Sequence, residues 1–330
     1  MRKTILVLTD NMLDQINGVV TTYQNLKTEA EKSGEYEICF ITPADFLHFG
    51  CPGYKEVKLS IPFGLKKLIQ KIKPHHIHIA TEGPIGLAAR LILDKQKIKY
   101  NTSYHTQFPE FLDKIYRIPT SITYSYLRWF HKHSGKMLVT TQSMKYLLTQ
   151  KKFNCEMIVW TRGVDESIFT PNLHVNNNPK ILLNIGRVSE EKNLEAFCDL
   201  DIMNARKIIV GDGPYKKKLM EKYPDIEFVS SKRGNELAEY YRNADVFVFP
   251  SKTDTFGIVN IESIACGTPV AAYPVQGPID IINSGSDGYL DYDLAQAVYR
   301  CLAIKREDVL KSRSNWSWHN CWEIFKNNLV

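Results

Sequence analysis

The sequence predicts an α/β protein built from two parallel-sheet domains in tandem. Three observations predict it. The length of 330 residues exceeds what one hydrophobic core usually supports. Short β-branched runs alternate with amphipathic stretches along the chain. This alternation stops at a polar, turn-rich segment, residues 172–179, and then starts again. We therefore expect an N-terminal domain at 1–165, a linker at 166–179, a C-terminal domain at 180–312 and a terminal helix at 313–330.

Each domain alternates strands with helices. In the first domain we expect strands at residues 4–9, 36–42, 76–80, 99–104 and 136–140, and helices that include 19–32 and 65–73. In the second domain we expect strands at residues 181–185, 207–210, 226–229, 245–250 and 269–272. The final stretch carries three tryptophans and is expected to form a helix that packs on the protein's own surface. Two such domains leave a cleft that faces the carboxyl ends of their strands, where open α/β folds bind ligands.

Composition narrows the class of protein. No apolar run approaches the roughly 20 residues that cross a bilayer, and the N-terminal apolar run is too short for a signal peptide. The seven cysteines are odd in number and scattered, which fits a reducing cytoplasm and predicts neither a disulfide framework nor a metal site. A net charge of +6, evenly spread, excludes nucleic acid as the expected partner but suits an anionic ligand or an anionic membrane surface.

The first candidate motif is IGRVSEEKN, residues 185–193. A strand is expected to end there, Gly186 allows a turn, and Ser189 is placed to cap a following helix. Arg187 and Lys192 would then clamp a diphosphate, the guanidinium as a fork and the ammonium as a point charge. The alternative is that Lys192 is a surface lysine paired with the local glutamates. A second motif, VGDGP, carries Gly211 and Gly213, which would let backbone N–H groups approach a ligand or simply form a tight turn.

The most informative stretch is residues 249–270, FPSKTDTFGIVNIESIACGTPV. A buried strand leads to a polar loop with Asp254, and a helix follows that Gly267 is expected to end. Glu262 lies among aliphatic residues of that helix. An unpaired buried carboxylate costs several kcal/mol, on the order of 3–5 when a partner is removed, so a ligand's hydroxyls would be suitable partners. The alternative is that Asp254 only caps the helix and that Glu262 is a buried ion pair.

These motifs, in this order, resemble the glycosyltransferases of family 4, which have the two-Rossmann GT-B fold and retain anomeric configuration. RGVD, NADVFVFPS, TDNMLDQINGVVTT, HIATEGPIGLAAR and SYHTQFPEF add to the likeness, which covers nearly the whole chain. The resemblance is greatest to the subgroup of glycolipid α-mannosyltransferases and sulfoquinovosyl diacylglycerol synthases. The broader family usually has Glu where this chain has Asp254, and the TDTFG form is typical of that subgroup.

The resemblance implies a role for each matching residue. Arg187 and Lys192 would hold the donor diphosphate, and Glu262 would bind the ribose hydroxyls. Asp254 would hold the donor sugar. The remaining donor-side and catalytic positions that the resemblance implies are Gly18, His105, Gly186, Gly211, Gly213, Thr255, Phe256 and Gly257. His105 would lie near the anomeric centre, or else be a loop histidine that the backbone satisfies. No cofactor or metal ion is implied.

The expected function is transfer of a hexosyl group, of mannose or glucose type, from a GDP- or UDP-linked sugar to a lipid or glycan hydroxyl. Two alternatives remain: a nucleotide-sugar 2-epimerase of the same fold, and a catalytically silent subunit that binds a nucleotide sugar. The helix expected at 65–73 has an apolar stripe and a lysine-rich face. We expect the stripe to pack on the sheet, while the lysines can still meet an anionic membrane at the cytoplasmic face.

Overall fold

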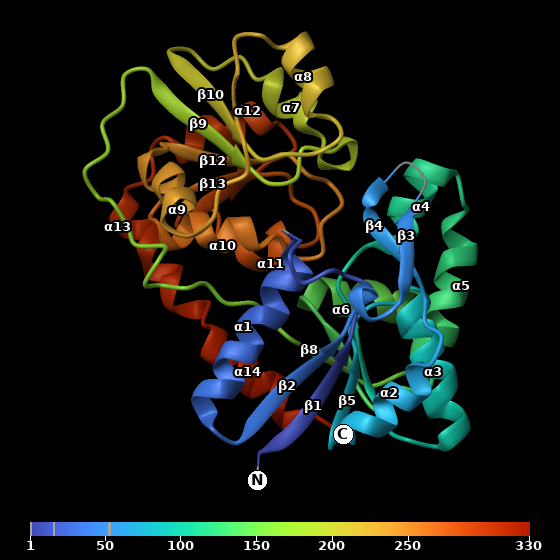
Figure 1. The fold of residues 1–330 in the computed structure, drawn as a ribbon. Coiled ribbons are helices and arrows are strands. Elements are labelled where there is room, and N and C mark those ends of the chain that lie inside the picture. The colour runs from blue at the N-terminus through green and yellow to red at the C-terminus, as the bar shows by residue number, and fades with distance from the viewer. Residues whose placement is uncertain (1, 16, 52–53) are drawn as a thin grey trace. The chain divides into compact units, whose positions relative to one another are not determined.

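The computed structural model of the chain describes all residues except 1, 16, 52 and 53. It forms two compact units, one of Met1–Arg162 with Trp318–Val330 and one of Gly163–Ser317 (Figure 1). The N-terminal segment of the first unit ends at Arg162. The terminal helix, which we expected as a segment of its own, belongs to this unit.

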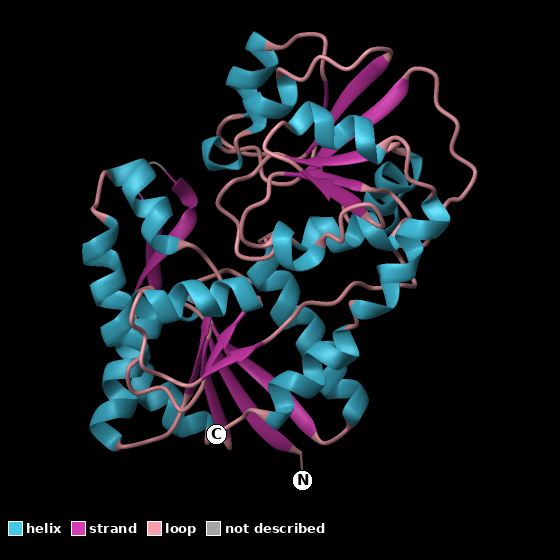
Figure 2. Cartoon of the chain, turned by 180° about the vertical axis from the view of Figure 1, so that it is seen from behind, coloured by secondary structure: helices cyan, strands magenta, loops and turns pink. Residues whose placement is uncertain are grey.

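The first unit is a parallel six-stranded sheet in the order β2-β1-β5-β6-β7-β8, with helices on both faces (Figure 2). Its sheet strands are β1 Lys3–Leu8, β2 Tyr36–Ile41, β5 His76–Ile79, β6 Asn101–Tyr104, β7 Met137–Val139 and β8 Met157–Val159. Its α-helices are α1 Gly18–Ser33, α2 Leu65–Ile72, α3 Pro84–Gln96, α4 Phe108–Tyr116, α5 Thr120–His131, α6 Gln142–Gln150 and α14 Trp318–Asn327, and a 3-10 turn, η1, spans Pro43–Asp45.

The terminal helix completes the first unit. α14 packs against α1, and its Trp322 and Phe325 are buried. The indole of Trp160 donates a hydrogen bond of 2.9 Å to the carbonyl of Cys321 on this helix. The expectation that the tryptophan-rich end packs on the protein itself is confirmed.

An antiparallel hairpin interrupts the alternation of the first unit. Its strands are β3 Leu47–Cys51 and β4 Tyr54–Ile61. The hairpin was not expected from the sequence, and neither were β8 nor the last strand of the second unit. The apolar stripe of α2 lies as expected, since Leu65 and Ile69 are buried in the core of this unit.

The second unit repeats the architecture, with a parallel sheet in the order β11-β10-β9-β12-β13-β14. Its strands are β9 Lys180–Ile185, β10 Ala205–Val210, β11 Glu227–Val229, β12 Val246–Phe249, β13 Val270–Ala272 and β14 Gly288–Leu290. Its α-helices are α7 Leu194–Cys198, α8 Lys216–Lys222, α9 Gly234–Asn243, α10 Ile258–Ala265, α11 Pro278–Ile281, α12 Leu294–Cys301 and α13 Arg306–Val309, and its 3-10 turns are η2 Glu190–Lys192 and η3 Leu310–Asn315.

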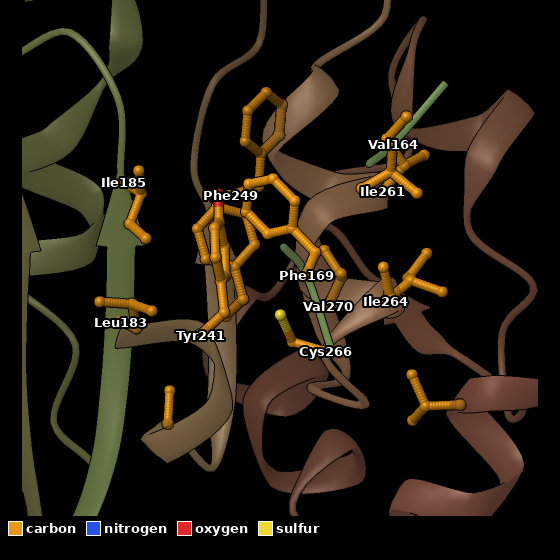
Figure 3. Packing of buried hydrophobic residues seen from close by; sticks show 14 of the residues in the cluster. Val164, Phe169, Leu183, Ile185, Tyr241, Phe249, Ile261, Ile264, Cys266 and Val270 are labelled. Atoms are coloured by element: carbon orange, nitrogen blue, oxygen red, sulfur yellow. The ribbon is translucent and has the colours of Figure 1, made fainter. Parts of the chain in front are cut away.

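Alternating side chains of the central strands supply two cores, one on each face of this sheet. On β9, Leu183 and Ile185 point to the core that contains α9 and α10, while Leu182 points to the core that contains α7 and α12. Figure 3 shows the first of these cores, where Phe249 of β12 and Tyr241 of α9 lie beside the β9 side chains. Strands buried on both faces explain why the sequence shows continuous apolar runs instead of an apolar–polar alternation. The strands expected from the sequence all form.

Candidate active site

The strand order of the second unit identifies a candidate ligand-binding edge of its sheet. The chain leaves β9 for β10 on one side and later returns to place β12 on the other side of β9. In open α/β sheets the crevice lies at such a switch point, outside the carboxyl ends of the two strands. The loops that follow β9 and β12 carry Arg187 and Lys192, and Asp254 to Gly257, respectively.

An ion pair joins the two loops. The ammonium nitrogen of Lys192 donates to Oδ2 of Asp254 at 2.5 Å, and both side chains are partly exposed. The side-chain amide of Asn193 also donates to the carbonyl of Pro250 at 3.0 Å. Lys192 therefore forms an ion pair across the switch point, with Asp254. The structure brings together two candidates that are 62 residues apart in the sequence.

The turn after β9 differs from the expected helix start. Ser189 precedes the 3-10 turn Glu190–Lys192, and its hydroxyl donates to Glu191 at 2.6 Å instead of capping backbone N–H groups. Asn193 then adopts a left-handed conformation with φ of 55° before α7 begins. This short turn, and not a longer helix, places the Lys192 side chain at the carboxyl end of β9.

The glycines of VGDGP serve close packing between two loops. A Cβ atom on Gly211 would lie 1.9 Å from the carbonyl oxygen of Gly186, and one on Gly213 would lie 2.3 Å from that of Val188. The amide of Val188 donates to the carbonyl of Asp212 at 3.0 Å. The loop after β10 therefore supports the β9 loop directly, and any larger side chain would force the two apart.

The loop after β12 enters α10 through a glycine. Gly257 has φ of 85° and occupies the N-cap position, so Asp254 does not cap the helix. Thr255 and Phe256 are buried, and the Phe256 ring lies 5.6 Å from that of Trp316. Gly267, with φ of 77°, follows the last helical turn as expected. The buried side chains of Thr255 and Phe256 hold the loop in place. The Asp254 carboxylate lies at the switch point, where it accepts from Lys192.

The side chain of Glu262, on α10, accepts a hydrogen bond from a tyrosine of α9. The hydroxyl of Tyr241 donates to Oε2 of Glu262 at 2.9 Å. Burial raises the pKa of this carboxyl to about 7, and the hydrogen bond from Tyr241 opposes the rise. In the described part of the chain, no basic side chain forms an ion pair with Glu262, so the interpretation as a buried ion pair is wrong.

Gly18 and His105 lie in the first unit. Gly18 is the first residue of α1, and the side chain of Asn17 caps that helix by accepting from the amides of Val19 and Val20. His105 directly follows β6, at the carboxyl end where the sequence placed it. The structure therefore gives these two residues positions in a different unit from the other candidates.

His105 belongs to a buried hydrogen-bond network. Its Nδ1 lies 2.8 Å from Nη2 of Arg162, and its Nε2 lies 2.9 Å from the hydroxyl of Tyr23. Because a guanidinium only donates, Nδ1 accepts, and the neutral ring carries its proton on Nε2 and donates to Tyr23. Burial, and then the charge of Arg162, hold the pKa of His105 well below its usual range.

The network extends beyond what the sequence indicated. The hydroxyl of Tyr23 also lies 2.8 Å from Nε2 of His78, whose pKa burial lowers to about 3. Arg162 stands in the RGVD motif, which carried no assigned role, and donates to the carbonyl of Trp160 at 2.7 Å. The sequence gives no local signal of this network, because His78 lies in a strand and Arg162 lies 57 residues from His105. Within the described residues no group of three or more His, Cys, Asp or Glu side chains could hold a metal ion.

Two Rossmann-like units, each with a parallel six-stranded sheet, are the architecture of the GT-B class of α/β fold. Two family models match consecutive parts of the chain: Glycosyltransferase Family 4 matches residues 16–168, and Glycosyl transferases group 1 matches residues 165–296. The chain belongs to the glycosyltransferases that these two models describe, as the resemblance of its motifs predicted.

Curated relatives come from the predicted subgroup. The chain is 26% identical to a sulfoquinovosyl transferase of Arabidopsis thaliana, with 87% of this chain and 62% of that protein covered. It is 27% identical to an alpha-monoglucosyldiacylglycerol synthase of Streptococcus pneumoniae, with 90% and 77% covered. It is 26% identical to a GDP-mannose-dependent alpha-mannosyltransferase of Corynebacterium glutamicum, with 87% and 76% covered. The chain thus spans less than two thirds of the plant relative's length.

Solved structures share the fold. Sucrose-phosphate synthase from Thermosynechococcus elongatus superposes with a TM-score of 0.79 at 19% identity, over 99% of this chain and 98% of that one. The Anabaena protein HepE, in complex with UDP and glucose, superposes with a TM-score of 0.73 at 14% identity, over 98% of both chains. Among the described helices, none has the length and hydropathy that a membrane crossing requires.

Proposed function

We propose that the protein transfers a hexosyl group of mannose or glucose type from a GDP- or UDP-linked sugar to a hydroxyl of a glycolipid or glycan, with retention of anomeric configuration. The observation that carries the proposal is the ion pair of Lys192 and Asp254 at the switch point of the second unit. The ion pair supports the proposal because it brings a cation and a carboxylate to one strand edge. We propose that the cation binds the diphosphate of the donor and that the carboxylate binds its sugar.

Arg187 and Lys192 stabilise the departing diphosphate. Charge builds up on the leaving group as the glycosidic bond breaks, and preorganised donors lower that barrier by about 2.7–4 kcal/mol each in other systems. Lys192 has three N–H donors, of which Asp254 takes one, so two remain for phosphate oxygens. These two cations act without a metal ion in the reaction that we propose.

Glu262 binds the ribose hydroxyls in this account. Donor binding supplies two O–H groups, and these favour the ionised carboxylate. Asp254, together with the backbone from Thr255 to Gly257, then holds hydroxyls of the sugar. In the first unit, His105 acts as a neutral group because burial and Arg162 keep its pKa low. Gly18, the first residue of α1, has a donor-side role in this account.

A thermal-shift panel of nucleotide sugars tests the proposal. We expect one GDP- or UDP-linked hexose to raise the melting temperature, and product analysis to show transfer only when an acceptor is present. A 2-epimerase would convert the donor without any acceptor, and a silent subunit would bind it without turnover. Either result would reject the transferase function.

We propose in addition that the first unit docks on an anionic membrane through the β3–β4 hairpin and α2. Leu47 and Ile61 are paired across the hairpin and are 74% and 51% exposed, and Phe63, in the turn before α2, is 93% exposed. The lysines of the adjoining helix segment, Lys66, Lys67, Lys71 and Lys73, are all exposed. Apolar side chains beside a row of lysines suit the interface of an anionic bilayer.

Co-sedimentation with liposomes tests the docking. Wild-type protein is expected to bind vesicles with 30% anionic lipid more strongly than zwitterionic vesicles, by about 1 kcal/mol for each lysine near the surface. Phe63→Ser, or Lys66→Ser with Lys67→Ser, should weaken binding. Met203→Ser, which removes an apolar side chain that is 85% exposed in the second unit, serves as the control. Equal binding to both kinds of vesicle would reject the docking.

A further inference from the structure

In the described part of the chain, Arg162 is a buried cation without a counter-ion. It is 3% exposed, and its Nη1 donates to the carbonyls of Trp160 at 2.7 Å and Thr161 at 2.9 Å. The guanidinium also lies 4.4 Å from the centre of the Trp160 ring. Other arginines of the described residues form ion pairs with carboxylates, whereas Arg162 forms none. The fold therefore keeps this cation in place despite the cost that burial of an unpaired charge carries.

The second terminal nitrogen of this guanidinium, Nη2, contacts His105. It lies 2.8 Å from Nδ1 of His105, and because a guanidinium has no lone pair to offer, Nδ1 is the acceptor. The neutral ring then carries its proton on Nε2, which lies 2.9 Å from the hydroxyl of Tyr23. The contact with Arg162 therefore decides which nitrogen of His105 is protonated.

The contact with Tyr23 does not make this choice. A phenol hydroxyl both donates and accepts, so it can pair with a ring nitrogen that carries a proton or with one that does not. The hydroxyl of Tyr23 also has two other partners for its own proton, Nε2 of His78 at 2.8 Å and Oγ of Ser103 at 3.3 Å. Without Arg162, the ring of His105 could carry its proton on either nitrogen and keep its hydrogen bond to Tyr23.

Arg162 also supplies the charge that acts on this ring. The other titratable groups of the network are Tyr23 on α1, His78 on β5 and Cys321 on α14. Burial raises the pKa of Tyr23 above its usual range and that of Cys321 to about 12, and it lowers the pKa of His78 to about 3. All three groups are therefore neutral at neutral pH. After burial itself, the charge of Arg162 is the largest cause of the low pKa of His105.

We propose that Arg162 is a positioning residue, which fixes His105 as the tautomer with its proton on Nε2 and thereby makes the imidazole a hydrogen-bond donor that does not take up a proton during transfer. This inference rests on the proposed transferase function, in which His105 contacts the sugar that is transferred. With Nδ1 occupied by Arg162 and Nε2 protonated, the ring has no lone pair that could accept a proton. A ligand oxygen that replaces the Tyr23 hydroxyl would meet an N–H donor and not a base.

The ring nitrogens of His105 report its tautomer directly through their nitrogen-15 chemical shifts, and His105→Gln identifies the signals. We expect wild type to carry the proton on Nε2 throughout the range from about pH 5 to pH 8. Arg162→Met removes the donor and the charge, so the tautomer with the proton on Nδ1 should become populated. A proton on Nδ1 in wild type, or an unchanged tautomer in folded Arg162→Met, would overturn the inference.

Arg90→Met is the matched control. Arg90 is also 3% exposed, donates to the carbonyls of Phe130 and Trp129, and stacks on the Trp129 ring. Its replacement removes a buried guanidinium of the same unit with the same kinds of contact, so it shows what the loss of packing alone does. The signals of His105 should keep their wild-type shifts in Arg90→Met.

Turnover tests the consequence for the reaction. With the donor that the thermal-shift panel identifies, Arg162→Met should lower kcat by about tenfold or more, with a smaller change in the donor KM, and Arg90→Met should keep the wild-type kcat. His105→Gln still offers an N–H donor but takes up no proton, so it should keep a higher kcat than His105→Leu, which offers no donor. Equal kcat in wild type and Arg162→Met, or a His105→Gln variant no more active than His105→Leu, would overturn the inference.

Melting temperatures show whether the variants fold. If Arg162→Met does not, the wild-type tautomer and the comparison of His105→Gln with His105→Leu decide the inference. If wild-type protein turns over no nucleotide sugar, the transferase function fails instead. The ring signals of wild type and Arg162→Met need no substrate, and they still decide whether Arg162 sets the tautomer of His105.

Discussion

Replacing Glu262 with glutamine tests whether burial of its carboxyl makes the stability of the second unit depend on pH. Burial raises the pKa of Glu262 from 4.5 to about 7, so the folded protein holds this proton more tightly than the unfolded chain does. The resulting stabilisation is complete below pH 4.5 and is lost as the pH rises through 7. At about 1.4 kcal/mol for each pH unit, the full effect is about 3 kcal/mol.

Glutamine does not titrate, and its amide oxygen can still accept the hydrogen bond from Tyr241. Scanning calorimetry of wild type and Glu262→Gln between pH 5 and pH 8 should therefore show the variant gaining stability relative to wild type by up to about 3 kcal/mol. For a domain of this size that is several degrees in melting temperature, at about 2–4 °C per kcal/mol. Comparison with Glu221→Gln, whose side chain is 68% exposed, removes general effects of charge. Parallel stability curves for wild type and Glu262→Gln would refute the reasoning.

Three further substitutions test packing. Gly213→Ala should lower the melting temperature of the second unit and donor affinity together, because the new methyl group meets the Val188 carbonyl; unchanged values by calorimetry and titration would contradict this. Asn260→Val should raise the melting temperature, because the side-chain nitrogen and oxygen of Asn260 are buried without a hydrogen-bond partner. Each such group costs about 1–3 kcal/mol. A lower melting temperature would show that the amide does have hydrogen-bond partners. Trp322→Ala should destabilise the first unit by about 3–5 kcal/mol in denaturant unfolding, and a loss below 1 kcal/mol would show that α14 is dispensable.

The sequence predicts the strands that form the centre of each sheet because they are buried on both faces and read as apolar runs. It does not predict two edge strands of three residues, β14 Gly288–Leu290 and β8 Met157–Val159, although it does predict β11 Glu227–Val229, which is an edge strand of the same length. The β3–β4 hairpin is missed as well. Its apolar side chains, such as Leu47 and Phe49, are exposed, so no core periodicity marks them.

The candidate site shows a similar division. Motif order alone places Lys192 and Asp254 at the ends of two strands, but the sheet order is needed to show that these strands are neighbours. The resemblance also identifies His105, whereas its partners Tyr23 and Arg162 lie 82 and 57 residues away and carry no local signal. Ser189 does not cap a helix as expected, because its hydroxyl donates to the Glu191 side chain. Residue propensities do not show whether a serine hydroxyl will bond to the backbone or to a neighbouring side chain.

Donor affinity of Lys192→Ala tests the central claim most directly. Isothermal titration with the nucleotide sugar from the panel compares this variant with Lys217→Ala, which removes a lysine of the same unit whose side chain is 90% exposed. If Lys192 binds the diphosphate, its variant should lose at least tenfold in affinity, which corresponds to about 1.4 kcal/mol, while Lys217→Ala keeps the wild-type value. Equal affinity in all three proteins would contradict the placement of the donor at the switch point of the second unit.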